Sequence, residues 1–203
     1  TIGSIAWLAR NESRLDGIRA GLVIGLLGDP GSLTYKRSRR AQSEIDHIAA
    51  AVVRGLDPRA RIVDFSPYGY DERQFCSPGI NLPVGRLTRS SNGEYAEYNT
   101  SADAPGLLQP QAVAQSIRAI CMICARLDSN RLFRSRSPNG EPRLGRRGLF
   151  RPTGGTDPGD FEHAMLWLLN LADCTHGLQD AHAASGLPLA TLERAAQALV
   201  DAQ

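Results

Sequence analysis

Eleven residues of the chain, GEYAEYNTSAD at positions 93–103, gather carboxylates, phenols, hydroxyls and an amide with no apolar run between them. Two interpretations fit these residue types. The turn could cap the helix that follows it, or it could form the rim of an active site. The side chains that could act there are Glu94, Tyr95, Glu97, Tyr98, Asn99 and Asp103.

A second candidate for chemistry is Asp29, which follows the apolar run GLVIGLLG at residues 21–28. Such a run predicts a buried strand that ends in a tight turn. Ligands of open α/β sheets bind at the carboxyl ends of the strands, so Asp29 is a candidate site residue that Pro30 and Gly31 would hold rigidly. The alternative is an aspartate that starts a turn and accepts hydrogen bonds from the next amides.

Charged residues in two further segments are candidates for binding a substrate. Those in TYKRSRR, residues 34–40, could bind a carboxylate or phosphate, or they could be the solvated start of a helix. Those in the loop at 68–84 could line a site, as charged loop residues often do, or could pair with each other at the surface. The candidates are Lys36, Arg37, Asp71, Glu72 and Arg73.

Hydrophobic periodicity predicts the elements that must position these groups. Helices are predicted at 2–12, 38–56 and 110–127, and strands at 21–28, 61–66 and 79–89. Pro83 interrupts the last strand, so we expect that strand at an edge or a bulge of its sheet. The alternation of strands and helices predicts that residues 1–128 belong to an α/β layer domain.

The composition changes after residue 128. Residues 129–159 are rich in Arg, Pro, Gly and Ser and are interpreted as an Arg-rich linker. Residues 160–203 predict three helices, and the Gly-containing turn between the last two is typical of a helix-turn-helix. Arg194 is the single basic Lys or Arg side chain in this module, and DNA affinity comes largely from such cations, so the sequence argues against a nucleic-acid partner.

The overall composition excludes little beyond this. The 203 residues carry a net charge of +2, which indicates neither nucleic acid nor an anionic membrane as a partner. The sequence contains no bilayer-spanning apolar run and opens with no secretory leader, so we expect a cytoplasmic protein without membrane contact. Cys121 and Cys124 lie three residues apart in a helical pattern and are expected to be buried thiols.

Both ends of the chain fall within helical patterns, which favours a piece of a longer protein. The alternative is that Thr1 is an N-terminal nucleophile, because a free α-amine beside a hydroxyl can act as its own base. The oligomeric state is left open by the sequence.

Several motifs, in their order and spacing, resemble one bacterial family. They are TIGS, GLLGDPG, TYKRSRR, YDERQFCSPGINLPVGRLTRSSNGEYAEY and TSAD. That family consists of zinc-peptidase-like proteins with an aminopeptidase-type α/β domain and a C-terminal winged helix, distantly related to co-catalytic zinc aminopeptidases and glutaminyl cyclases. The resemblance covers nearly the whole chain and is densest from 68 to 103. It implies a three-layer α/β domain followed by a winged-helix-like module.

The resemblance also implies a metal site with one or two zinc ions. It places one metal ligand at Asp29 and another at Asn99, where the family has His, while the other ligands and the general base would precede Thr1. Asn is a poor zinc ligand because its carbonyl oxygen is neutral and hard. Three alternatives follow. The site binds one metal or a harder one, it binds substrate without turnover, or Glu97 or Asp103 supplies the missing ligand.

The function that this resemblance implies is hydrolysis of an amide-like bond in a small peptide or an aminoacyl amide by metal-bound water. The alternative is a non-catalytic binding or regulatory protein on the same scaffold, and DNA binding by the helix-turn-helix is a less favoured alternative. Because several ligands are expected elsewhere, the chain alone is expected to be inactive.

Overall fold

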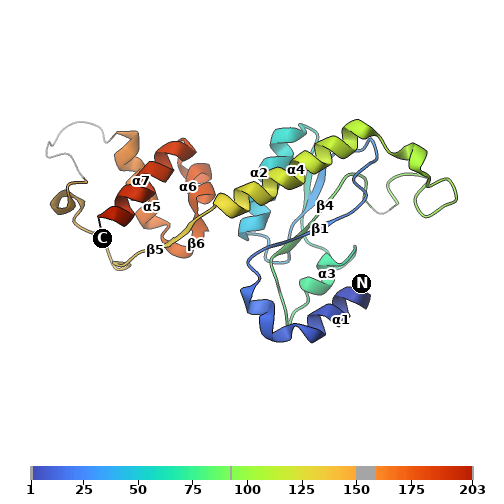
Figure 1. Ribbon diagram of the computed structural model, residues 1–203, viewed down its shortest axis with the longest axis horizontal. Helices are drawn as coiled ribbons and strands as arrows, with labels where there is room; N and C mark the ends of the chain where they lie inside the picture. Colours follow the sequence, from blue (N-terminus) through green and yellow to red (C-terminus); the bar gives the residue numbers. More distant parts are fainter. Residues whose placement is uncertain (1, 92, 150–158, 203) are drawn as a thin grey trace. The chain divides into compact units, whose positions relative to one another are not determined.

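The computed structural model describes residues 2–91, 93–149 and 159–202. The chain divides into two compact units, Thr1–Leu127 and Asp128–Gln203, and Figure 1 shows their elements. The mixed α/β class predicted from the sequence is confirmed. Thr1 and positions 150–158 of the predicted linker lie outside the described residues.

The N-terminal unit is built on a four-stranded mixed sheet. Its strands, in sheet order, are β1 (Gly21–Ile24), β4 (Val84–Thr88), β2 (Thr34–Lys36) and β3 (Arg61–Val63). β1 runs parallel to β4 and β2 parallel to β3, whereas β2 is antiparallel to β4. The helices are α1 (Ile2–Arg10), η1 (Glu12–Gly17), α2 (Glu44–Leu56), α3 (Glu72–Phe75), η2 (Pro105–Leu107) and α4 (Pro110–Ser129).

Apolar side chains cover both faces of this sheet. On one face, Leu87 of β4 packs with buried residues of α2 and α4. On the other face, Val84 packs with Leu8 of α1 and Cys76 at the end of α3, and Figure 1 shows α1 and α3 on the side away from α2 and α4. The core face of α2 repeats at helical spacing, with Ile45, Ile48, Ala49, Val52 and Val53 buried. Each Ile or Val buried in this way contributes about 1.5–3 kcal/mol.

The strand predicted at 79–89 is shorter than expected and lies inside the sheet. It begins at Val84, after Pro83, whose carbonyl accepts a hydrogen bond from the Gly21 N–H at 3.0 Å. Pro83 therefore stands just before the ladder and removes no donor from it, so the expectation of an edge strand was wrong.

The two cysteines of α4 are exposed, so the prediction that they are buried was wrong. The buried face of α4 consists of Ala112, Ser116, Ala119 and Ile123, and positions 121 and 124 do not share it. The free thiol that is buried is Cys76, which lies just after α3.

The C-terminal unit contains the helices predicted after residue 160. They are α5 (Asp160–Asn170), α6 (Leu178–Ser185) and α7 (Leu189–Asp201). Their core includes Met165, Leu168, Leu178 and Leu192. Gly186 ends α6 in the left-handed conformation with φ of 72°, which glycine adopts without steric cost.

Part of the segment interpreted as a linker belongs to this unit. The strand β5 (Leu132–Arg134) pairs with β6 (Asp173–Gly177) in an antiparallel ribbon. The Asn130 side chain accepts a hydrogen bond from the Gln179 N–H at 3.0 Å. Leu144, in the short helix η3 (Leu144–Arg147), is 3% exposed. A three-residue strand is too short to show a period in the sequence, which is why composition alone indicated a linker here.

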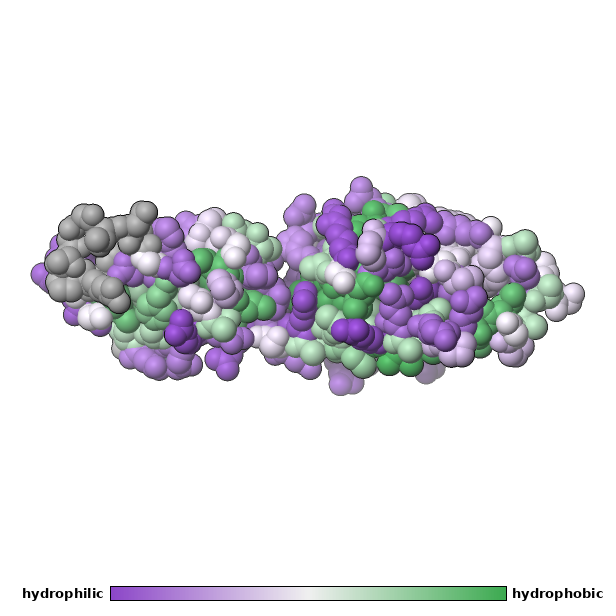
Figure 2. Space-filling view, turned by 90° about the horizontal axis from the view of Figure 1, so that it is seen from above, coloured by the Kyte–Doolittle hydropathy of each residue, from purple (hydrophilic) through white to green (hydrophobic). Residues whose placement is uncertain are grey.

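Hydrophilic residues cover most of the face shown in Figure 2, with apolar residues in small groups between them. Among the described residues, none of the helices combines the length and the apolar character that a bilayer crossing requires.

Candidate functional site

The loops after β1 and β4 meet at one end of the sheet. Because the strands are parallel neighbours, with Ile24 opposite Leu87, their carboxyl ends lie side by side. Asp29 follows β1, and its Oδ1 accepts hydrogen bonds from the Ser90 hydroxyl at 2.5 Å and from the Gly31 N–H at 2.8 Å. The Ser90 N–H lies 3.3 Å from both carboxylate oxygens. The Asp29 carboxylate is therefore fixed from two segments of the chain.

Gly31 allows this contact because it has no side chain. A Cβ atom at this position would lie 2.4 Å from Ser90 Oγ and 2.7 Å from Asp29 Oδ1, closer than real Cβ atoms approach. The bond from Gly31 also means that Asp29 caps its own turn, as the alternative interpretation of the sequence proposed. Capping the turn does not remove Asp29 from the surface, since it also lines a pocket.

This pocket has a volume of about 440 Å³ and brings Asp29 together with the polar turn at 93–103. Its polar lining comes from Asp29, Ser90, Tyr95, Glu97 and Asp103. Apolar walls come from Leu26, Leu27, Leu107 and Leu108. Three carboxylates, a hydroxyl and a phenol therefore line one cavity whose walls are partly apolar, and small-molecule sites commonly combine apolar walls with a few polar groups.

Two tyrosines near the pocket remain protonated at neutral pH. The Tyr95 hydroxyl donates to Asp103 Oδ2 at 3.3 Å. Burial raises the pKa of Tyr95, and the negative charge of Asp103 raises it further. The Tyr70 hydroxyl lies 3.3 Å from the Tyr98 hydroxyl, and burial followed by this hydrogen bond raises the Tyr70 pKa above its ordinary value. Tyr95 can therefore donate a proton in a hydrogen bond at the pocket but does not supply an anion.

Arg89, which no local sequence pattern had indicated, ties the Asp29 loop to α4. It is 5% exposed, and its guanidinium donates to the carbonyls of Gly31 at 2.7 Å and Ala112 at 3.2 Å. It also donates to Ser116 Oγ at 3.2 Å and to Gln115 Oε1 at 3.0 Å. Burial lowers the pKa of Arg89, and the charge of Asp29 opposes that effect. The partners of Arg89 lie 23 to 58 residues away along the chain, and Asp29, the partner of Ser90, lies 61 residues away. Neither Arg89 nor Ser90 could therefore be identified as a site residue from its neighbours in sequence.

Asn99, the second predicted metal ligand, does not line this pocket. It is exposed and adopts the left-handed conformation with φ of 57°, which Asn tolerates better than most residues. The turn therefore presents Glu97 and Asp103 to the pocket, and Asn99 lies outside its lining.

Lys36 and Glu72, predicted to bind substrate, are buried together inside the unit. The Lys36 side chain is 2% exposed and that of Glu72 is 0% exposed, and the two are 3.0 Å apart. Lys36 Nζ also donates to the carbonyls of Ser66 and Tyr68, each at 2.6 Å. Arg86 Nη1 lies 3.5 Å from the same Glu72 oxygen, so two cations face one carboxylate. This burial speaks against contact of Lys36 or Glu72 with a substrate.

The other predicted substrate-binding residues are also separate from the pocket. Arg37 lies 3.6 Å from Asp64, whose side chain is 87% exposed. Asp71 precedes α3, and its carbonyl accepts from the Gln74 N–H at 2.9 Å. Arg73 is half-buried, and its Nε has no hydrogen-bond partner among the described residues. The structure therefore unites Asp29 with the polar turn but not with these charged residues.

Comparison with known proteins assigns the chain to a family. Residues 1–130 match the family described as "Domain of unknown function (DUF4910)", and this match covers more than half of the sequence. The chain belongs to the DUF4910 family. Residues 131–203 match a winged helix-turn-helix family, which confirms the predicted C-terminal winged helix.

Two relatives of this DUF4910 chain come from Clostridium acetobutylicum. One is named "Putative polysaccharide biosynthesis protein with aminopeptidase-like domain" and is 42% identical over 200 residues, which cover 98% of this chain and 46% of that protein. The other is a crystal structure described as a "putative peptidase", with a TM-score of 0.72 and 39% identity over 100% of this chain and 45% of that chain. This chain thus spans less than half the length of either relative. The names support an aminopeptidase-like relationship, while membership among zinc aminopeptidases stays a prediction.

The described residues of this chain do not supply a full set of zinc ligands. Among them, no group of three or more His, Cys, Asp and Glu side chains is arranged to hold a metal ion. A catalytic zinc requires three protein ligands. Asp29 is suited to be one of these, because ligating carboxylates are commonly oriented by further hydrogen bonds such as those from Ser90 and Gly31.

Proposed function

We propose that this chain forms part of an aminopeptidase-like hydrolase that cleaves an amide-type bond, and that Asp29 contributes one metal ligand to its active site. The observation that carries the proposal is the Asp29 carboxylate, fixed by Ser90 and Gly31 at the edge of a 440 Å³ pocket. The names of the two relatives, which specify an aminopeptidase-like domain and a peptidase, support the same class of reaction. The other ligands and the general base would come from the length of the relatives that this chain does not span.

The residues of this chain would position the substrate rather than carry out proton abstraction. When bound at such a site, zinc polarises a carbonyl and lowers the pKa of its water toward about 7. Ser90 and Gly31 hold Asp29 in one orientation. Tyr95 stays protonated, and its hydroxyl would exchange its hydrogen bond to Asp103 for one to a carbonyl oxygen of the substrate. Leu107 and Leu108 supply part of the apolar wall of the cavity.

The substrate class that we propose is a small peptide or an aminoacyl amide. A pocket of about 440 Å³ lies within the range of ordinary small-molecule sites. The name of the first relative points to polysaccharide biosynthesis, so an amide attached to a sugar derivative is a substrate to include in the assay.

A second candidate is a binding or regulatory protein on the same scaffold without turnover. The observation in its favour is that Asn99 occupies the position expected for a His ligand and is exposed outside the pocket lining. On this interpretation, the pocket at Asp29 binds a ligand, and no metal is retained there.

The experiment that separates these candidates uses the full-length protein that contains this chain. Metal content and hydrolysis of aminoacyl amides are measured for the unaltered protein, Asp29→Ala and Ser90→Ala. We expect Asp29→Ala to abolish both. Ser90→Ala should lower metal affinity or turnover by about tenfold, because it removes a hydrogen bond that orients the ligand. Asp64→Asn, at an exposed position far along the chain from Asp29, is the matched control and should have no effect.

Two results would contradict the proposal. Full metal content and turnover in Asp29→Ala would remove Asp29 from the site. Absence of turnover in the unaltered protein, with a ligand bound, would favour the binding protein. A further variant, Asn99→His, tests whether the turn at 93–103 supplies a metal ligand. A gain of zinc affinity would show that residue 99 reaches the metal, and an unchanged zinc affinity would show that it does not.

A further inference from the structure

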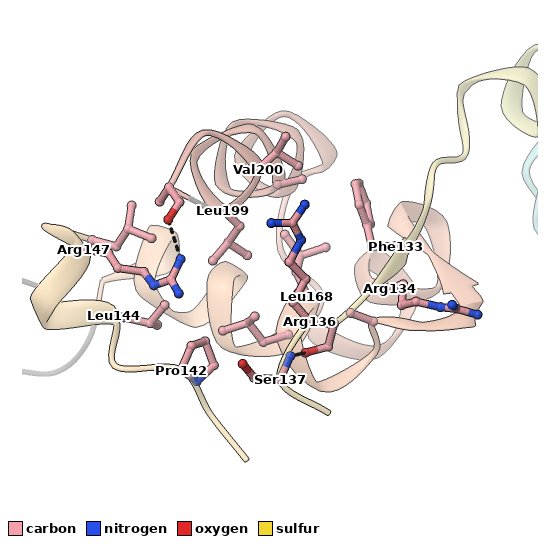
Figure 3. Close-up of a pocket in the computed structure, with 16 residues that line it drawn as sticks. Phe133, Arg134, Arg136, Ser137, Pro142, Leu144, Arg147, Leu168, Leu199 and Val200 are labelled. Atoms are coloured by element: carbon pink, nitrogen blue, oxygen red, sulfur yellow. Dashed lines mark hydrogen bonds between the residues drawn. The ribbon is translucent and has the colours of Figure 1, made fainter. Parts of the chain in front are cut away.

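The C-terminal unit contains a second pocket, which the proposed function does not use. It lies between β5, η3, α5 and α7, and its volume is about 130 Å³ (Figure 3). Leu144, Leu168 and Ala196 form its most buried walls, being 3%, 4% and 7% exposed. An apolar cavity of roughly 150 Å³ is known to stay free of water and to admit benzene. This pocket therefore fits a single aromatic ring or a branched hydrocarbon group.

The charged residues in the described lining of this pocket are all arginines. Arg134, Arg136 and Arg147 are among its lining residues, and no Asp or Glu is found in the described lining. Two of these arginines are occupied, since Arg147 donates to the Ala202 carbonyl at 2.5 Å and Arg134 donates to Cys174 Sγ at 3.3 Å. Arg136 has no hydrogen-bond or ion-pair partner in the part of the chain that the structure describes. Figure 3 shows its side chain extending across the pocket toward Val200 of α7.

An apolar cavity beside an uncompensated guanidinium selects for a particular kind of ligand. The hydrocarbon part of such a ligand gains free energy by leaving water for a cavity of matching size. A carboxylate on the same molecule can accept two parallel hydrogen bonds from a guanidinium, a geometry that favours Arg over other cations. A neutral hydrocarbon would make only the first of these interactions, and a fully polar anion only the second.

We propose that this pocket binds a small carboxylate with a branched or aromatic hydrocarbon body, with the body between Leu168 and Leu199 and the carboxylate on Arg136. The winged-helix unit is then a receptor for a small organic acid. This proposal does not depend on the Asp29 site, because all the residues involved belong to the C-terminal unit.

The test is a titration of the 203-residue chain with 3-methylbutanoate and with benzoate, followed by calorimetry and by NMR chemical shifts. The neutral amides 3-methylbutanamide and benzamide are the matched ligand controls. We expect the carboxylates to bind with Kd of about 1 mM or tighter, given their few heavy atoms. The amides should bind about tenfold more weakly, because they lack the charge-assisted hydrogen bonds to Arg136.

Three variants locate the binding. Arg136→Gln should weaken carboxylate binding about tenfold and leave amide binding unchanged. Val200→Phe places a larger side chain at a pocket-lining position that is 47% exposed, so it should weaken carboxylates and amides alike without loss of folding. Arg143→Gln removes an exposed arginine of the same segment that does not line the pocket, and should change nothing.

Several outcomes would overturn the proposal. They are no binding of either carboxylate, equal binding of carboxylates and amides, and equal losses in Arg136→Gln and Arg143→Gln. Binding that survives Val200→Phe would place the ligand elsewhere on the chain. Circular dichroism of each variant confirms that a lost signal reflects the ligand and not unfolding.

Discussion

Replacement of Glu72 by Gln should destabilise the N-terminal unit strongly. The carboxylate accepts from Lys36 Nζ at 3.0 Å and from the Tyr70 N–H at 3.0 Å, and Arg86 lies 3.5 Å away. Gln has nearly the same shape but no charge, so the two buried cations would lose the carboxylate that both of them face. Removing one partner of a buried ion pair costs about 3–5 kcal/mol, which is roughly a fifth or more of the stability of an ordinary domain.

The two tryptophans of the chain provide the assay, because one lies in each unit. Trp7 packs against Phe75 of α3 with ring centroids 6.2 Å apart, so its fluorescence reports on the helix that carries Glu72. In a Trp167→Phe background, urea unfolding then follows the N-terminal unit alone. With about 2 kcal/mol per molar urea, a typical slope for a small domain, the midpoint of Glu72→Gln should fall by about 2 M.

Two further variants make this prediction refutable. Asp64→Asn breaks an exposed pair with Arg37 and should cost no more than about 1 kcal/mol. Arg86→Met should cost less than Glu72→Gln, because Lys36 still neutralises Glu72 and two nitrogens of Arg86 have no hydrogen-bond partner among the described residues. If Glu72→Gln lowered the midpoint no more than Asp64→Asn does, the inference of an excess buried positive charge would be wrong.

Three other predictions concern metal, pH and DNA. After dialysis, the 203-residue chain should hold zinc weakly or not at all by metal analysis; tightly held stoichiometric zinc would contradict the incomplete ligand set. The hydrogen bond from the Ser91 N–H, and after it the charge of Arg61, hold the pKa of Glu94 below its usual range. The stability that these contacts contribute is therefore present at neutral pH and is lost as the pH falls through the lowered pKa. An NMR titration should show that Arg61→Gln raises the pKa of Glu94. In a gel shift at low salt, residues 160–203 alone should not retain duplex DNA, because Arg194 is their single Lys or Arg side chain; tight, salt-sensitive binding would refute this.

The sequence was sufficient for features that depend on local pattern. Periodic apolar residues located α2, α4 and the three C-terminal helices, because a helix buries one face every 3.6 residues whatever its partner. The same reasoning placed Asp29 at a strand end, and the structure brings it to one pocket with the turn at 93–103. That turn could be singled out because its polar residues have no apolar partner to bury.

Features that depend on distant partners could not be read in this way. Lys36 and Glu72 look solvent-exposed in sequence because each stands in a polar segment, and their burial depends on a pairing across 36 residues. The positions of Cys121 and Cys124 depended on which side of α4 faces the sheet, and a pair spaced three apart fits either side. Arg89 acts through partners on α4 and in the Asp29 loop, which only the folded chain brings within reach.

The direction of β2 explains why the basic segment after it does not reach Asp29. No strand was predicted at residues 34–36, so the sequence did not indicate in which direction the basic segment leaves the sheet. In the structure β2 is antiparallel to β4, with Thr34 opposite Thr88 and Lys36 opposite Arg86. The carboxyl end of β2 therefore points away from the end where β1 and β4 place Asp29 and Ser90.

Two contacts agree with this geometry. Arg40 donates to the carbonyl of Asn81, which precedes β4, at 2.7 Å. Arg61, at the start of β3, pairs with Glu94 of the polar turn at 3.0 Å, because β3 runs parallel to β2 and so begins at the end of the sheet where β4 ends. One reversed strand thus sends the basic segment to the opposite end of the sheet and leaves the carboxylate of Asp29 without a cationic clamp from that segment. Any substrate anion at the Asp29 pocket would have to be held by groups other than Lys36 and Arg37.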